Sequence, residues 1–260
     1  MDWPNFLSNK YMHHFTFTLQ HQALGADANG WSGGKCVTTR APWRRRVAII
    51  ICDMWDNHWS SGAAERVNIM APRMNQVLHA ARNHGAHILH APSETMPFYA
   101  NSAARQRMLD LPAVQLPAAK EHPAPPLPID ASDHGSDTGE TSTFKAWSRQ
   151  HSALDIDEAR DGISDNGEEI YRYLQQQQIE QVLIMGVHTN MCVLNRSFAI
   201  KQMVRWGVPI ALVRDLTDAM YNPAMAPYVS HDDGVQLVIG YIEKFWCPTI
   251  ESGQLYLALS

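Results

Sequence analysis

The order of hydrophobic and polar positions along the chain changes repeatedly between a strand pattern and a helix pattern. Two runs, at residues 47–52 and 182–187, are continuously apolar, which is typical of strands buried on both faces of a parallel sheet. Other segments carry apolar residues at helical spacing. The predicted strands are residues 47–52, 86–90, 182–187 and 209–213, and the predicted helices are residues 67–81, 165–174, 191–206 and 235–245. This alternation predicts an α/β fold with a doubly wound, mainly parallel sheet flanked by helices, a Rossmann-like three-layer arrangement.

Boundary residues support several of these elements. Asp165, followed three residues later by Glu168, has the spacing of a capping box and is predicted to begin the third helix. Gly85 and Gly207 follow helical patterns and predict helix ends. Pro72 lies inside the first helical pattern, where it predicts either a kink or the start of a second helical part.

Two segments fall outside this pattern. Residues 14–19 alternate between apolar and polar and precede a glycine-rich stretch at 30–34, which predicts an N-terminal β-hairpin arm over residues 1–44. Residues 95–145 are rich in Pro, Ala, Asp and Ser and lack a core of their own, so they are predicted to be a surface insertion in a domain spanning residues 45–260. We expect this insertion to cover the pocket of its own or of a neighbouring subunit.

The composition narrows the possible partners. The chain has 260 residues, of which 45% are hydrophobic, and a net charge of −5, which argues against nucleic acid as a partner. No apolar run approaches the roughly 20 residues of a membrane helix, and the N-terminus does not have the pattern of a signal peptide. The four cysteines form no CxxC pair, so a reducing, cytoplasmic location is expected. A small molecule is the expected partner.

Two reactive side chains follow buried strands, and ligands of such folds bind at the carboxyl ends of the strands. Cys192 lies at the predicted start of a helix, where free amide groups and the helix dipole favour the thiolate and could hold an oxyanion. The alternative for Cys192 is a packed, inert thiol. Asp53 ends an apolar strand, where burial would raise its pKa towards that of a general base. Its alternative is a hydrogen-bonded turn residue.

Three motifs resemble a known family. Residues 49–56 (IIICDMWD) resemble the opening signature of the isochorismatase-like cysteine hydrolases, a hydrophobic strand followed by Asp-Met-Gln-Asn-Asp. Residues 186–193 (GVHTNMCV) resemble the nucleophile turn of that family, Gly-Val-x-Thr-x-x-Cys-Val. Residues 211–219 (ALVRDLTDA) are similar to the family's strand that ends in Asp-Ala. The resemblance covers residues 46–245 in the correct order and is of the nicotinamidase and N-carbamoylsarcosine amidohydrolase type.

The resemblance implies a triad of Asp, Lys and Cys, with Asp53 and Cys192 as two of its members. It also implies a cis peptide bond between Val187 and His188, with the amide groups of His188 and Cys192 as oxyanion donors. The chain departs from the pattern at the lysine, whose expected position is occupied by Ser148. We predict that Arg149 takes this place and holds Asp53 ionised.

Two other possibilities for the lysine position remain open: Lys145 occupies the space, or nothing does.

Some members of the family also bind a metal through an Asp-x-His motif after the second strand, but residues 90–94 here read HAPSE. Asp56 and His58 have suitable side chains but follow the first strand, so neither a metal nor a cofactor is expected. Trp55, His58, Glu94 and His188 are predicted to contact the substrate. The family also implies a homo-oligomer.

The function that the resemblance implies is hydrolysis of a C–N bond in a small amide, carbamoyl or ureido substrate, through a thioester on Cys192. Hydrolysis of the vinyl ether of isochorismate needs no thiol, so Cys192 favours the amidohydrolase reaction. The alternative is a catalytically impaired member that serves as a ligand-binding or assembly module, which the missing lysine would favour.

Overall fold

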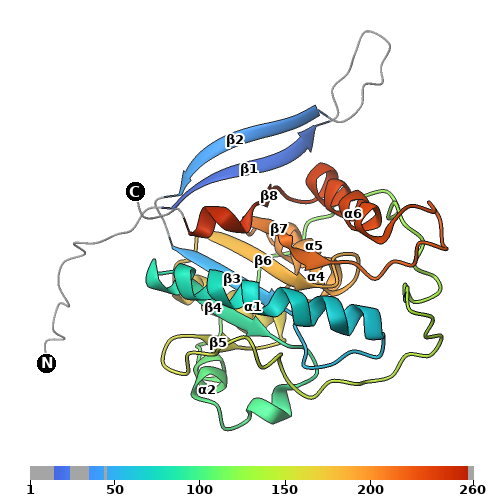
Figure 1. Cartoon of the computed structure of the whole chain (residues 1–260). Helices are drawn as coiled ribbons and strands as arrows, with labels where there is room; N and C mark the ends of the chain where they lie inside the picture. Colours follow the sequence, from blue (N-terminus) through green and yellow to red (C-terminus); the bar gives the residue numbers. More distant parts are fainter. Residues whose placement is uncertain (1–14, 24–34, 44–45, 257–260) are drawn as a thin grey trace, which may run out of the picture.

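A computed structural model describes residues 15–23, 35–43 and 46–256 of the chain (Figure 1). The strands are β1 (Phe15–Ala23), β2 (Lys35–Trp43), β3 (Val47–Cys52), β4 (His87–Ala91), β5 (Gly162–Ile163), β6 (Gln181–Val187), β7 (Ile210–Asp218) and β8 (Thr249–Ile250). The helices are α1 (Ser61–Asn83), α2 (Ala103–Leu109), α3 (Gly167–Gln176), α4 (Cys192–Asn195), α5 (Ile200–Arg205) and α6 (His231–Phe245), with short 3-10 helices η1 (Met96–Tyr99) and η2 (Ser252–Leu255).

All eight strands form one sheet in the order β2-β1-β8-β7-β6-β3-β4-β5. From β8 to β5 every neighbouring pair is parallel, whereas β1 runs antiparallel to both β2 and β8. The predicted doubly wound, mainly parallel α/β fold is therefore confirmed. Because β3 and β6 lie in the middle of the sheet, their carboxyl ends meet at one edge, beside the residues that follow them.

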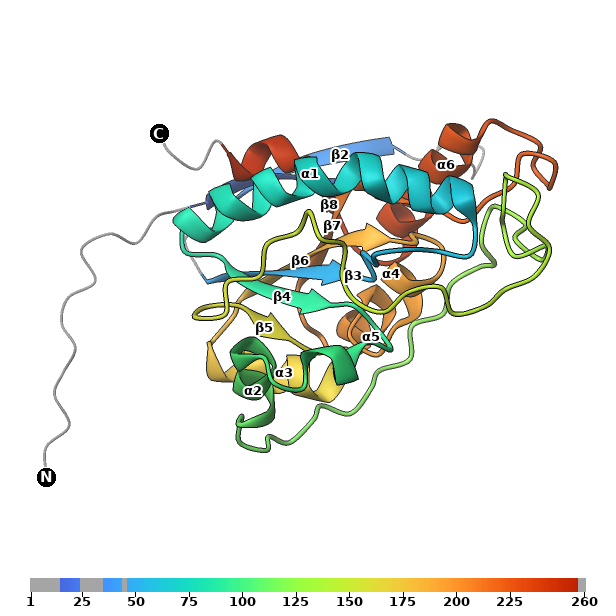
Figure 2. The same ribbon diagram turned by 60° about the horizontal axis from the view of Figure 1, so that its bottom comes forward.

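Helices cover both faces of the sheet, as Figures 1 and 2 show. Alternate side chains of β3 belong to two separate cores because successive strand residues point to opposite faces. Val47, Ile49 and Ile51 pack with apolar residues of α1, whereas Ala48 and Ile50 pack with residues of α3, α5 and α6. The continuously apolar run of β3 thus follows from burial on both sides.

Two predicted helix boundaries were wrong. The single helix expected over residues 191–206 is two helices, α4 and α5, because Arg196 has an extended ψ of 155° and ends α4. The cap of α3 is Asn166, whose side chain accepts hydrogen bonds from the backbone amides of Glu168 and Glu169, and not Asp165. The carboxylate of Asp165 instead accepts a hydrogen bond from the amide of Glu94. Pro72 lies within α1, which continues through it.

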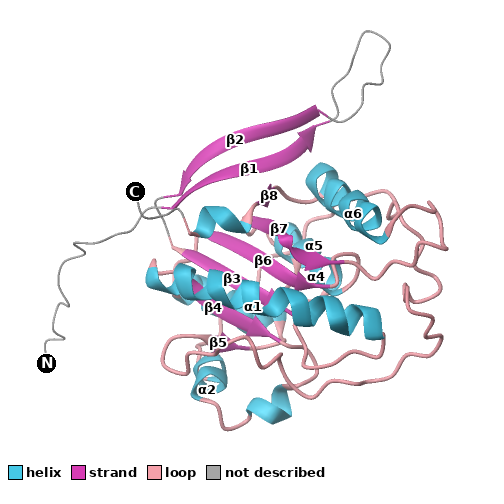
Figure 3. Cartoon of the chain, in the orientation of Figure 1, coloured by secondary structure: helices cyan, strands magenta, loops and turns pink. Residues whose placement is uncertain are grey.

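The segments at the edge of the domain agree in part with the sequence. β1 and β2 form the expected hairpin, while the glycine-rich residues 30–34 lie outside the described residues. β1 pairs with β8, so the arm joins the main sheet. The insertion contains η1 and α2 and then runs as loop towards β5 (Figure 3). The division into residues 1–44 and 45–260 stays a prediction. In the described part of the chain, no helix has the length and apolar character needed to cross a membrane.

Gly186, at the end of β6, is expected to tolerate no side chain. Its φ is +115°, and a Cβ atom placed there would lie 2.1 Å from the carbonyl oxygen of Cys52 on β3. We expect Gly186→Ala to lower the free energy of unfolding by roughly 3 kcal/mol or more, measured by urea denaturation. Gly253→Ala is the matched control, since a Cβ there meets nothing within 4 Å. Equal stability of the two variants would contradict this packing.

Candidate active site

Asp53 and Cys192 lie together at the carboxyl edge of the sheet. Asp53 directly follows β3, is fully buried, and has a left-handed φ of 48°, which is uncommon outside glycine and often marks a functional position. One carboxylate oxygen of Asp53 accepts the amide of Ser93 at 2.8 Å, and the other accepts Nε of Arg196 at 2.8 Å. The thiol of Cys192 also interacts with this carboxylate.

Burial dominates the protonation of both groups. It raises the pKa of Asp53 above the usual range, while Arg196 and the hydrogen bonds from Ser93 and Cys192 act in the opposite direction. Burial, followed by the charge of Asp53, raises the pKa of Cys192 to about 12. The expectation that the helix start favours a thiolate was therefore wrong. α4 has only four residues, so its dipole is small, and Cys192 rests as a neutral thiol beside the carboxylate of Asp53.

The position predicted for Arg149 is taken by Arg196. The side chain of Arg149 is 49% exposed, and its Nε lies 3.8 Å from Asp56, not beside Asp53. Arg196 approaches Asp53 from the break between α4 and α5 and lies over the ring of Trp55, 5.9 Å from its centroid. A usable signal was present in the sequence: Arg196 is four residues after Cys192, on the same side of one helical turn.

The nucleophile turn has the implied backbone. The Val187–His188 peptide bond is cis. Within the turn, the amides of Thr189, Met191 and Val193 each donate to a backbone carbonyl. Cys192 begins α4 directly after this turn. The amides of residues 188 and 192 therefore belong to the same short segment of the chain as the thiol.

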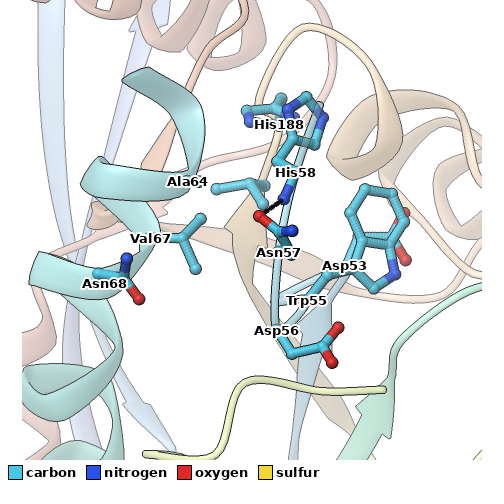
Figure 4. A pocket seen from close by; sticks show the side chains of 10 residues that line it. Asp53, Trp55, Asp56, Asn57, His58, Ala64, Val67, Asn68 and His188 are labelled. Carbon is cyan, nitrogen blue, oxygen red and sulfur yellow. Dashed lines mark hydrogen bonds between the residues drawn. The ribbon is translucent and has the colours of Figure 1, made fainter. Parts of the chain in front are cut away.

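A small pocket lies between α1 and the loop that follows β3 (Figure 4). Asp53, Trp55, His58 and His188 are among the residues that line it. The ring of Trp55 stacks on that of Trp147 at a centroid distance of 3.9 Å, and His58 contacts His188 edge-on at 4.9 Å. The structure thus brings three of the four predicted substrate residues to one pocket.

The fourth predicted substrate residue, Glu94, is not among the residues that line this pocket. Its carboxylate is 3.8 Å from Arg196, and its side chain is about half exposed. Its backbone is left-handed, with a φ of 66°. Asp165 accepts its amide, and Lys145 donates to its carbonyl. Lys145, the second possibility for the missing lysine, therefore contacts the backbone of Glu94.

The two histidines of the pocket are uncharged. Burial lowers the pKa of His58 to about 4 and that of His188 to about 3, so both imidazoles are neutral at physiological pH. Among the described residues, Nε2 of His188 and Nε1 of Trp147 are buried without a hydrogen-bond partner. Buried polar atoms without a partner are uncommon in folded proteins. Of the two residues, His188 lines the pocket.

Sequence reasoning missed an ion-pair cluster behind His188. Arg66 of α1 contacts Asp137 of the insertion at 2.8 Å and Asp218 of β7 at 2.9 Å. His231 of α6 donates from Nδ1 to the carbonyl of Tyr221 and lies 2.8 Å from Asp218 through Nε2. No sequence pattern links these positions, since they come from four separate segments.

The same part of the insertion covers the beginning of α1. Glu140 accepts hydrogen bonds from the amide and hydroxyl of Ser61, and Ser136 contacts the hydroxyl of Ser60 at 3.2 Å. The hydroxyl of Thr138 accepts a hydrogen bond from the amide of Gly62 in α1. The insertion thus packs on its own chain, beside the loop that carries His58.

The cluster makes stability depend on pH. Burial opposes charge on His231, but the hydrogen bond and charge of Asp218 outweigh it and raise the pKa of His231. A raised histidine pKa stabilises the fold below its unfolded value of about 6.5, and this contribution is lost as the pH rises through the folded pKa. We expect His231→Gln to cost about 1 to 2 kcal/mol at about pH 6 and less at about pH 9, measured by urea denaturation. An equal cost at both pH values would contradict an ionised His231.

The residues near the pocket do not fit the metal site of some family members. Within the described ranges, no group of three His, Cys, Asp or Glu side chains is arranged to hold a metal ion. Asp56 accepts the amide and hydroxyl of Ser148, and Nδ1 of His58 accepts the amide of Ser60. Their coordinating atoms therefore already have protein partners.

Comparisons with known proteins agree with this geometry. The chain is similar to a cysteine hydrolase from Pseudomonas syringae pv. phaseolicola 1448A, with 17% identity over 82% of this chain and 92% of the other and a TM-score of 0.50. It is also similar to an isochorismatase-like hydrolase from Alkaliphilus metalliredigens, with 13% identity over 83% and 97% and a TM-score of 0.47. The likeness to the cysteine hydrolase supports the fold. A search of curated protein sequences found no match.

The sequence model of the isochorismatase domain matches residues 47–226, which is more than half of the chain. This range contains both Asp53 and Cys192, together with the break in the helix that carries Arg196. The chain therefore belongs to the isochorismatase family of hydrolases.

Proposed function

We propose that this protein hydrolyses a C–N bond in a small amide, carbamoyl or ureido substrate through a thioester on Cys192. The observation that carries the proposal is the interaction of the Cys192 thiol with the buried carboxylate of Asp53, which also accepts a hydrogen bond from Nε of Arg196 at 2.8 Å. A nucleophile in contact with a base that is itself held by a third group is the arrangement used for covalent catalysis. Here Arg196 and the amide of Ser93 hold the base.

The first half of the reaction forms the thioester. Asp53 takes the proton of the Cys192 thiol as sulfur attacks the substrate carbonyl, so no free thiolate has to accumulate at a pKa of about 12. The amides of His188 and Cys192 are the proposed donors to the oxyanion. Asp53 then gives the proton to the leaving nitrogen, and the C–N bond breaks.

The second half hydrolyses the thioester. Asp53, again ionised, takes a proton from water as the water oxygen attacks the acyl carbon. The C–S bond breaks, and the proton returns from Asp53 to the sulfur of Cys192. The products are an acid and the Cys192 thiol, and Asp53 is again ionised. The protein therefore returns to its starting state.

Substrate recognition is proposed for the groups that the fold leaves available. Trp55 and His58 offer ring faces, while the unpartnered nitrogen of His188 offers one hydrogen bond. Glu94 does not line this pocket, and it is proposed to contact the part of the substrate that faces Arg196. Because His58 and His188 are both neutral, they favour uncharged polar groups.

The proposal is tested by incubating the purified protein with a panel of small amides, carbamoyl compounds and ureides and measuring the release of ammonia or amine. The Cys192→Ser variant is the matched control. Release by the wild-type protein alone supports the proposal. No release from any compound would favour the catalytically impaired alternative.

A further inference from the structure

We infer that Arg196 is the positioning residue that keeps Asp53 ionised, in the role that the family resemblance gives to a lysine. This inference rests on the proposed function, because it assigns a part in the same reaction. It concerns a residue that follows the nucleophile in the chain, whereas the lysine position of the family pattern lies before it, at Ser148.

The backbone around Arg196 is arranged to deliver its side chain to Asp53. α4 ends at Asn195 and α5 begins at Ile200, and Arg196 between them leaves the helix with an extended ψ of 155°. Its amide still donates to the carbonyl of Cys192 at 3.0 Å, so cation and nucleophile are fixed relative to one another. Arg196 therefore stays one helical turn from Cys192, and its extended ψ redirects only the chain that follows it.

The contacts of the guanidinium group hold it in one place. Nε donates to Asp53 at 2.8 Å, the group lies over the ring of Trp55, and another nitrogen is 3.8 Å from Glu94. Asp53 itself has no exposed surface, and a buried carboxylate without a countercharge takes up a proton. Arg196 is the cation that opposes this effect of burial on the pKa of Asp53.

The charge of Arg196 also suits the proton transfer. The neighbouring acids, Asp53 and Cys192, both raise the pKa of Arg196 over the opposing effect of burial, so the cation interacts with both groups. When the proton moves from sulfur to carboxylate, the negative charge moves between two atoms that face the same cation. An arginine does not lose its proton in this range, so it supplies charge without competing as an acid.

A purely structural role is the alternative explanation. In that case the ion pair would only tie the loop after β3 to the break between α4 and α5. The two roles differ in the pH dependence of the reaction. Activity falls at low pH as Asp53 takes up a proton, and this fall is the acid limb of the pH profile. Removal of a cation that keeps Asp53 ionised must move the acid limb to higher pH. Loss of a purely structural ion pair instead lowers activity or stability equally at every pH.

The test compares Arg196→Gln and Arg196→Lys with the wild type and with Arg149→Gln, a matched control that removes an arginine held by a different carboxylate. For each protein, the rate of Cys192 alkylation by iodoacetamide and the hydrolysis of any amide that the wild type cleaves are measured across pH. We expect Arg196→Gln to slow both reactions by on the order of 10- to 100-fold at about pH 6, with the acid limb moved to higher pH. Arg196→Lys is expected to restore the limb in part, and Arg149→Gln to leave it in place.

The outcomes separate the inference from the proposed function. If Arg196→Gln folds and its acid limb coincides with that of the wild type, the inference is wrong even where amides are hydrolysed. If Arg196→Gln does not fold, Arg196→Met takes its place: an acid limb moved to higher pH supports the role, and an unmoved limb overturns it. If the wild type itself neither hydrolyses amides nor shows selective alkylation of Cys192, the proposed function has failed.

Discussion

Replacement of Cys192 by alanine is expected to abolish amide hydrolysis, lowering kcat/KM by on the order of 10,000-fold or more. In the proposed mechanism the thiol forms the covalent intermediate, so its removal leaves Asp53 without the nucleophile that it serves. The small side chain of alanine fits where sulfur was, so the fold should persist, which circular dichroism would verify. The measurement is steady-state hydrolysis of the best amide from the substrate panel.

Cys247→Ala is the control for the loss of a thiol as such. Cys247 lies in the core near β8, is buried, and has its pKa raised by burial. The Cys247→Ala variant is expected to lose a little stability and to keep the kcat/KM of the wild type. If Cys192→Ala retained most of the wild-type activity, catalysis would proceed without a thioester, and the proposed mechanism would be wrong.

The second large effect is expected at Asp53. Asp53→Asn preserves the size of the side chain but removes the carboxylate that interacts with the thiol and can accept its proton. General-base contributions are typically 100- to 10,000-fold, and we expect a loss of about 1,000-fold in kcat/KM. Because the base must be ionised, the wild-type activity should rise through the raised pKa of Asp53 on the acid side, and the variant should lack this limb.

The free energy of unfolding of Asp53→Asn shows whether its loss of activity comes from the missing base or from unfolding. Burial raises the pKa of Asp53, so its ionised form costs the folded state free energy at neutral pH, and this cost disappears in Asp53→Asn. Against it, the variant leaves Arg196 with Glu94 as its remaining carboxylate. We therefore expect urea denaturation to show only a modest change. A variant that keeps activity at neutral pH would remove Asp53 from the mechanism.

The positions of Asp53 and Cys192 could be predicted because each directly follows a strand that the sequence marks clearly. A continuous apolar run such as β3 has few alternatives to a central parallel strand, and parallel strands bring their carboxyl ends together. The same logic placed Trp55, His58 and His188 at one pocket. The family motifs added the cis peptide bond, which no periodicity could indicate.

Arg196 could not be predicted from periodicity because the apolar pattern over residues 191–206 is that of one helix. The break depends on tertiary contacts: Asp53 attracts the guanidinium, and Gly167 packs so closely that a Cβ there would lie 2.0 Å from the carbonyl of Ser197. The cluster of Asp137, Arg66, Asp218 and His231 was missed for a similar reason. Its members share no spacing, and the insertion that carries Asp137 has no pattern to place it.

The measurement that tests the central claim most directly is the rate of Cys192 alkylation by iodoacetamide, followed by peptide mapping, in the wild type and in Asp53→Asn. A thiol with a pKa of about 12 is thiolate to only about one part in 100,000 at pH 7, so rapid alkylation there requires a base. We predict that, measured across pH, Cys192 of the wild type reacts at neutral pH faster than Cys247, with a rate that falls as Asp53 takes up a proton at acid pH, and that this acid limb is missing from Asp53→Asn. The same pH profile for Cys192 in both proteins would contradict the pairing of thiol and carboxylate on which the account depends.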